Sequence, residues 1–166
     1  MIRMIFMCDA DRVIGASDAA TNAKRCDLLP TSMMGEMCKL YHTRHAVLTD
    51  EQHMMGLHAK GFAGATKYVV TYKDKFNQPK DLTHVVPVAD LASLAKQYQE
   101  SGEELLVIGG LAVFKQLLPY TSQLEVLETE DLVPGDLVFS EWDNGNFAVN
   151  GEERWEGGRT LHLVRH

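Results

Sequence analysis

The sequence predicts a three-layer α/β domain with a mixed central sheet, and three observations support this prediction. Apolar strand-like segments alternate with short helical patterns through the first two thirds of the chain. Turn residues separate these segments, as expected where helices connect parallel strands. The last third is typical of strands joined by glycine-rich turns, which indicates antiparallel pairing. Together these patterns predict one sheet with both kinds of pairing.

Length, charge and composition indicate one intracellular domain. The chain has 166 residues, 45% of them hydrophobic, which is enough for one core and short for two, so we expect a single domain over residues 1–166. The net charge of -7 argues against nucleic-acid partners, because their binding depends on cationic contacts to phosphates. The N-terminus lacks the pattern of a signal peptide, and no apolar run is long enough to span a membrane. Three cysteines without metal-like spacing suit a reducing compartment. We therefore expect a cytoplasmic protein without membrane partners.

The first strand and loop follow from apolar patterning. Residues 1–8 form an almost continuous apolar run, broken only by Arg3, which predicts a central strand buried on both faces. Residues 9–20 contain acids and glycine around the apolar pair Val13 and Ile14, so we expect a loop ordered by these two side chains.

Helical spacing of apolar residues after Leu29-Pro30 predicts a helix from about Ser32 to His42. Thr31 or Ser32 would be its N-cap, and Glu36 would occupy a capping-box position. The next expected elements are a short strand, a short helix and a strand, at residues 46–49, 51–58 and 67–72.

The second half alternates in the same way. Pro87 among valines predicts a short edge strand, where proline is tolerated. Asp90 is expected to cap a helix that ends near Gly102. The remaining expected elements are a strand at residues 105–108, a helix at 111–118, a strand at 124–127, and two or three antiparallel strands within 136–164.

The most suggestive candidate site is the segment Glu104-Leu-Leu-Val-Ile-Gly-Gly-Leu-Ala-Val-Phe114. A buried strand that leads through Gly109 and Gly110 into a helix lets the backbone approach an anion, and the helix N-terminus adds free N–H groups and a partial positive charge. This pattern is typical of a diphosphate-binding turn. A double glycine also occurs in tight strand-to-helix turns that bind nothing, and the residues alone leave both interpretations open.

Three motifs, in their order and separations, resemble the dihydrofolate reductase family. They are Asp11-Arg-Val-Ile-Gly15, Val107-Ile-Gly-Gly110 leading into Val113-Phe-Lys-Gln-Leu-Leu-Pro119, and Gly135-Asp-Leu-Val-Phe139. The resemblance spans nearly the whole chain. It implies the family's mixed sheet of about eight strands with flanking helices, an NADPH site, and hydride transfer to a small pterin or pyrimidine-like substrate.

The resemblance also implies residues that bind NADPH. Ile14 and Gly15 match the start of a mobile loop that closes over the nicotinamide, and Asp136 matches an acid in the loop that supports it. Gly109 and Gly110 match the diphosphate glycines. The helix residues that would line the cofactor are Val113 and Phe114. The strand end that holds the adenosine 2′-phosphate corresponds to Thr71, Tyr72 and Lys73, with Lys75 as the alternative to the lysine.

The substrate-anchoring acid of the family has two candidate positions here. Aligned by the Leu29-Pro30 pair, it falls on Ser32. Aligned by distance from Gly15, it falls on Asp27, which is our candidate catalytic residue. The alternative for Asp27 is a surface or capping acid before Leu29.

Other positions also depart from the family. Thr49 and Asp50 stand where a glycine and an arginine would bind cofactor phosphate, and Asp50 would repel a phosphate. No arginine near Ala65 and Thr66 corresponds to the one that would hold a folate tail. We therefore consider three functions: reduction of dihydrofolate or a related pterin, reduction of a ribosylated pyrimidine as in the riboflavin pathway, and a non-catalytic binding or structural module.

Histidine pairs provide no clear metal site. His42 with His45, and His53 with His58, lack a third ligand at diagnostic spacing, so surface histidines are the better interpretation and we expect no metal.

Overall fold

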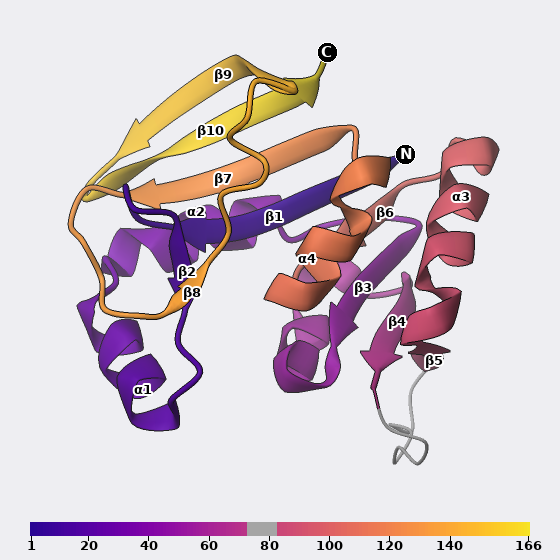
Figure 1. The fold of residues 1–166 in the computed structure, drawn as a ribbon, viewed down its shortest axis with the longest axis horizontal. Coiled ribbons are helices and arrows are strands. Elements are labelled where there is room, and N and C mark those ends of the chain that lie inside the picture. The colour runs from indigo at the N-terminus through magenta and orange to yellow at the C-terminus, as the bar shows by residue number, and fades with distance from the viewer. Residues whose placement is uncertain (73–82) are drawn as a thin grey trace. The chain divides into compact units, whose positions relative to one another are not determined.

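The structure is a computed structural model that describes residues 1–72 and 83–166 (Figure 1). The chain divides into two compact units, one of residues Met1–Met4 and Tyr41–Ser122 (unit 1) and one of residues Ile5–Leu40 and Gln123–His166 (unit 2). An eight-stranded mixed sheet has the strand order β5-β4-β3-β6-β1-β7-β10-β9. The predicted three-layer α/β fold is confirmed, with β1 (Ile2–Cys8) as a buried central strand. The prediction of a single domain stays a prediction.

The strands of unit 1 are parallel. β1 pairs with β6, β6 with β3, β3 with β4 and β4 with β5, and β5 is the predicted edge strand that contains Pro87. All residues of β3 and β6 are buried, as expected for strands covered on both faces. Because these strands share one direction, their carboxyl ends lie at the same sheet edge. The bounds are β3 (Ala46–Asp50), β4 (Thr66–Thr71), β5 (Thr83–Pro87) and β6 (Leu105–Val107).

The helices of unit 1 largely match their predictions. α3 (Leu91–Ser101) buries an apolar stripe and ends at Gly102, whose φ of 75° is the left-handed conformation that suits glycine. Asp90 precedes α3, but its side chain makes no cap hydrogen bond, so that prediction was wrong. The reason is that Asp90 already has helical φ and ψ, whereas an N-cap is normally extended. The other elements are α4 (Leu111–Leu117) and the 3₁₀ helices η1 (Glu51–His58), η2 (Lys60–Phe62), η3 (Val88–Asp90) and η4 (Leu118–Tyr120).

The strands of unit 2 confirm the predicted antiparallel arrangement. β10 pairs with both β7 and β9, and a separate two-stranded ribbon joins β2 to β8. Their bounds are β2 (Val13–Gly15), β7 (Gln123–Thr129), β8 (Leu137–Val138), β9 (Phe147–Trp155) and β10 (Gly158–Arg165).

A helix that the sequence did not predict follows β2. Residues 9–20 were expected to form a loop, but they contain β2 and the first two residues of α1 (Ala19–Leu28). Asp18 is the N-cap of α1, with its carboxylate accepting a 2.8 Å hydrogen bond from the Thr21 amide. The only side chain of α1 that is buried is that of Arg25, so the helix has no apolar stripe from which to predict it.

The following helix, α2 (Thr31–Leu40), is two residues shorter at its C-terminal end than predicted. The capping box was wrong: the Ser32 hydroxyl donates to the carbonyl of Glu156, and Glu36 pairs with Lys39 at 2.9 Å. Pro30 precedes the first turn directly, so Ser32 lies inside the helix instead of before it. None of the helices in the described part of the chain is long and apolar enough to cross a membrane.

Candidate functional site

Candidate residues gather at the carboxyl ends of β3 and β6 in unit 1. Gly109 and Gly110, joined by a cis peptide bond, follow β6 and lead into α4. β3 is the parallel neighbour of β6, so its last residues, Thr49 and Asp50, lie beside the glycines. Ligands of parallel α/β sheets bind at this kind of edge. We call these residues, together with His53 of η1, the glycine-turn site.

Side chains of β3 and η1 pack closely against both glycines, most tightly against Gly110. A Cβ atom on Gly110 would lie 2.5 Å from Oδ2 of Asp50 and 2.9 Å from Cε1 of His53. A Cβ atom on Gly109 would lie 3.0 Å from Cγ of His53 and 3.3 Å from Oγ1 of Thr49. The tight-turn interpretation of the double glycine is therefore sufficient to explain it. What the turn can bind depends on the side chains that cover it.

Asp50 and His53 form a hydrogen-bonded pair over the glycines. Oδ1 of Asp50 accepts from the backbone N–H of His53 at 3.0 Å and lies 2.7 Å from its ring Nδ1. The Asp50 side chain is 12% exposed, whereas that of His53 is 53% exposed. The hydrogen bond to Asp50 raises the pKa of His53, against the opposing effect of burial. His53 is therefore protonated more readily than an ordinary histidine.

The neighbouring groups are mostly acidic or neutral. The hydroxyl of Thr71, at the end of β4, donates to Glu51 at 2.6 Å. Tyr72 is half-exposed, and burial together with the charge of Asp50 raises its pKa. Lys73 and Lys75, expected to meet a 2′-phosphate, lie outside the described residues. The described side chains thus bring the Asp50 carboxylate against the turn, where it would repel a phosphate as expected from the sequence.

Two backbone and side-chain features nevertheless suit an anion. Gly110 is the N-cap of α4 and provides no side-chain cap, so the first-turn N–H groups of α4 have no side-chain acceptor there. The Thr49 hydroxyl is buried and has no hydrogen-bond partner among the described residues. A buried polar group without a partner is rare in folded proteins. Val113 and Phe114, by contrast, are buried in the core of unit 1, with 0% and 3% exposure.

The segment that the sequence matched to a mobile loop lies in unit 2. Ile14 and Gly15 belong to β2, which pairs with β8. The Asn22 side chain exchanges two hydrogen bonds with the backbone of Ala16, at 2.7 and 2.9 Å. Arg25 is buried, and its guanidinium donates to the carbonyl of Val13 at 2.9 Å. These contacts fix β2 to α1.

Asp136 accepts two hydrogen bonds from Ser17, which lies shortly after β2. Its carboxylate accepts from the Ser17 backbone at 2.8 Å and from the Ser17 hydroxyl at 2.6 Å. These hydrogen bonds lower the pKa of Asp136. The stabilisation is therefore present above the ordinary aspartate pKa and is lost as the pH falls through the lowered value.

Replacing Asp136 with asparagine is expected to loosen residues 15–18, because asparagine has an NH₂ donor in place of one of the two oxygens that accept from Ser17. Hydrogen exchange of the Ser17 amide should become faster in this variant, measured by NMR at neutral pH. Asp131 is exposed in the same connection, and its replacement with asparagine is the matched control. Equal Ser17 exchange in both variants would contradict this role for Asp136.

The two candidate anchor positions lie on different helices. Asp27 is on α1, is exposed, and forms no hydrogen bond or ion pair with the described residues. α2 is the helix that follows Leu29-Pro30, and Ser32 lies in its first turn. The Leu-Pro alignment thus corresponds to the start of α2, and the alignment by distance from Gly15 corresponds to the end of α1.

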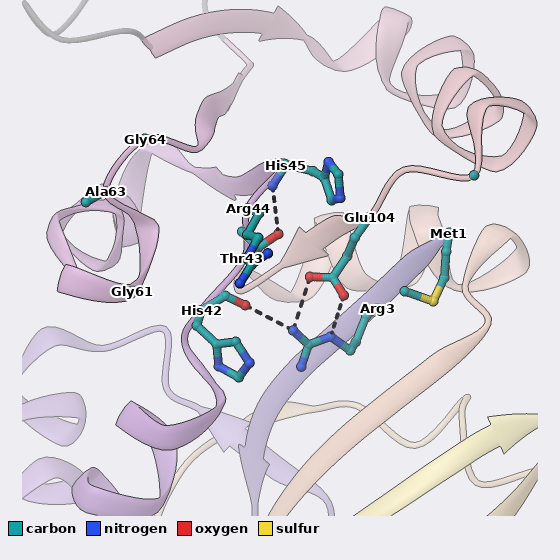
Figure 2. A pocket seen from close by; sticks show the side chains of 11 residues that line it. Met1, Arg3, His42, Thr43, Arg44, His45, Gly61, Ala63, Gly64 and Glu104 are labelled. Carbon is teal, nitrogen blue, oxygen red and sulfur yellow. Dashed lines mark hydrogen bonds and ion pairs between the residues drawn. The ribbon is translucent and has the colours of Figure 1, made fainter.

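A cavity lies at the opposite edge of the parallel strands, away from the glycine-turn site. A cavity of about 750 Å³ is lined by the segments that precede β3, β4 and β6 and by the start of β1 (Figure 2). Figure 2 shows Arg3 between Glu104, at 3.2 Å, and the carbonyl of His42. His45 also lines this cavity. Within residues 1–72 and 83–166, no three His, Cys, Asp or Glu side chains come together as a metal site.

Comparison with known families identifies the family to which the chain belongs. The model of the family described as dihydrofolate reductase matches residues 1–161. The chain belongs to this family. Members of the dihydrofolate reductase family are oxidoreductases that use NADPH. Among solved structures, dihydrofolate reductase from Enterococcus faecalis, complexed with NADP(H) and RAB-propyl, is 17% identical, with a TM-score of 0.72. The match covers 100% of this chain and 96% of that one, and it shows the shared fold. None of the curated proteins that were compared matches the chain.

His53 and His58 are exposed, as predicted, but sequence reasoning did not foresee that the His53 ring packs on the glycine turn in this member of the dihydrofolate reductase family. It treated His53 with His58 as surface residues, because nothing local links either of them to a turn over 50 residues away. The only available signals were Asp50 three residues earlier, which predicts an N-cap of η1, and the parallel pairing that brings β3 beside β6.

Proposed function

We propose that the chain is an NADPH-dependent reductase that reduces dihydrofolate or a related pterin by hydride transfer. The observation that carries this proposal is the family match, which covers residues 1–161 and so includes both the glycine-turn site and the β2 segment. The bound cofactor would supply the hydride, and the protein would supply binding, orientation and exclusion of water.

The backbone of the glycine-turn site fits a dinucleotide. Its side-chain charges fit a diphosphate when His53 is protonated. The uncapped first turn of α4 and the unpaired Thr49 hydroxyl would face a diphosphate with donors. Asp50 would oppose it, and His53 is the described side chain of this site that carries positive charge when protonated. We therefore assign cofactor binding to the α4 first turn and Thr49.

The proposal includes a residue that anchors the substrate, for which Asp27 and Ser32 are the candidates. Asp27 has the right chemistry, because a carboxylate can hydrogen-bond a pterin and raise the basicity of the ring nitrogen that is protonated. Ser32 has the right place, in the first turn after Leu29-Pro30, but its hydroxyl cannot stabilise a positive charge as a carboxylate can. We keep Asp27 as the candidate and Ser32 as the position to test against it.

A second candidate function is supported by the residues at the two anchor positions. A serine in the first turn of α2 and an exposed Asp27 without partners are also what a non-catalytic module of this family would have. A reductase of ribosylated pyrimidines is the alternative enzyme, and it would not require the folate-tail arginine that the sequence lacks.

Two variants separate these candidates when dihydrofolate reduction is measured with saturating NADPH. If Asp27 is the anchor, replacing it with asparagine should lower kcat/KM by about 100-fold, a typical contribution of a positioned acid. If the Ser32 position is the anchor, Asp27→Asn should be neutral and Ser32→Asp should raise kcat/KM. Absence of turnover in the wild type and in both variants, with NADPH still bound, would favour the module or the pyrimidine substrate.

A further inference from the structure

We propose that His53, oriented by Asp50, is the cationic group that binds the cofactor's diphosphate in this chain, so that dinucleotide binding requires a proton on His53. The inference rests on the proposed function, because it concerns the same cofactor site. It goes beyond that function by naming a residue that determines affinity and a pH dependence of binding.

One ring nitrogen of His53 is hydrogen-bonded to Asp50, and more than half of the side chain remains exposed. The ring packs on the glycine turn, with Cε1 only 2.9 Å and Nδ1 3.1 Å from where a Cβ of Gly110 would lie. Nδ1 is engaged by Oδ1 of Asp50 at 2.7 Å. The other ring nitrogen, Nε2, is left for a ligand, and more than half of the side chain is exposed. A ligand at the turn would therefore lie beside the His53 ring.

The charges of the groups around His53 make diphosphate binding depend on whether His53 is protonated. β3 contributes Asp50, the residue after β4 is Tyr72, whose pKa is raised by burial and by the charge of Asp50, and the glycine turn contributes no side chain. None of these neighbours is cationic. Without protonated His53, a diphosphate would therefore meet the Asp50 carboxylate and no positive side chain among these described residues.

Protonation reverses the interaction at Nε2. In neutral His53, Nδ1–H donates to Asp50, so Nε2 has a lone pair that repels phosphate oxygens. In protonated His53, Nε2–H becomes a donor, and the imidazolium balances the charge of Asp50. The hydrogen bond to Asp50 raises the pKa of His53, which favours the binding form near neutral pH. Affinity should therefore be high below this pKa and fall as the pH rises through it.

The first test is calorimetric binding of NADP⁺ and of NAD⁺ to the intact chain at several values between about pH 5.5 and 8.5. Above the pKa of His53, Kd should rise by up to about 10-fold per pH unit, because binding takes up one proton. NAD⁺ is essential because it lacks the 2′-phosphate, whose own titration near about pH 6 would imitate the effect. A pH dependence shared by both ligands assigns it to the protein.

Variants of η1 and of its N-cap, Asp50, then test whether His53 is the group that takes up the proton on binding. His53→Gln should bind weakly at every pH, and His53→Arg should bind tightly at every pH, since arginine stays charged. Asp50→Asn should move the midpoint to lower pH, because it weakens the hydrogen bond that raises the pKa of His53. His58→Gln is the matched control, an exposed histidine of the same helix, and should keep the wild-type profile.

A second readout follows the proton directly. The NMR titration of the His53 ring should shift to higher pH when NADP⁺ is bound. Thermal melts establish that each variant is folded. A pH-independent Kd in the wild type, or an unchanged pH profile in His53→Gln, would overturn the inference while leaving the proposed function in place. No binding of NADP⁺ at any pH would overturn the proposed function itself.

Discussion

Replacing Asp9 with alanine is expected to lower the free energy of unfolding by about 3 kcal/mol or more, because it leaves several buried N–H groups without acceptors. Asp9 is 1% exposed. Its Oδ1 accepts from the amides of Asp11 and Val13, at 2.9 and 3.1 Å, and its Oδ2 accepts from the amide of Val133 at 3.0 Å. One carboxylate thus joins the chain after β1 to the segment before β8.

Asparagine at position 9 should cost less than alanine. Its amide oxygen can still accept from Asp11 and Val13, while its NH₂ group would face the Val133 amide, a donor against a donor. Urea unfolding followed by circular dichroism measures both variants. The control is Asp11→Ala, an exposed side chain whose removal should change the unfolding free energy by less than about 0.5 kcal/mol. Similar losses in Asp9→Ala and Asp11→Ala would contradict this account.

Replacing Gly110 with alanine is expected to abolish cofactor binding and to destabilise unit 1 by about 1 to 3 kcal/mol, as overpacking usually does. The methyl group would lie 2.5 Å from Oδ2 of Asp50 and 2.9 Å from Cε1 of His53. Neither side chain moves freely, because they are hydrogen-bonded to each other at 2.7 Å. The substitution therefore breaks the pair that presents Nε2 of His53.

Gly35→Ala is the matched control for this prediction. Gly35 lies inside α2, and a Cβ there would have nothing within 4 Å. Alanine should therefore stabilise the chain by about 0.5 to 1 kcal/mol through the lower entropy of its unfolded state. Thermal unfolding with and without NADPH measures both effects. A ligand-induced shift that survives in Gly110→Ala would contradict the location of the cofactor site.

The elements that the sequence predicted have strong local signals. β1 and β6 are short runs of apolar residues, and α3 has an apolar stripe with glycine at its end. α1 was missed because its buried residue is Arg25, whose guanidinium binds carbonyl groups of distant segments. No apolar periodicity records such contacts. The Asp18 cap was the local signal available, and it is weak on its own.

The candidate site was predictable only in part. Gly109 and Gly110 stand out in the sequence, and the unfavourable charge of Asp50 near a phosphate also follows from the residues alone. The approach of His53 to the glycines does not, because it depends on the pairing of β3 with β6, strands that are far apart in the chain. The same pairing explains the double glycine as a packing requirement, an alternative that sequence reasoning left open.

The most direct test of the central claim uses one cuvette: NADPH is added to the purified protein at slightly acidic pH, and dihydrofolate follows. We predict that NADPH binds and quenches protein fluorescence, and that its nicotinamide absorbance then falls as dihydrofolate is reduced. Binding without loss of absorbance would contradict dihydrofolate as the substrate. No binding at a pH where His53 is protonated would contradict the assignment of the chain as an NADPH-dependent reductase.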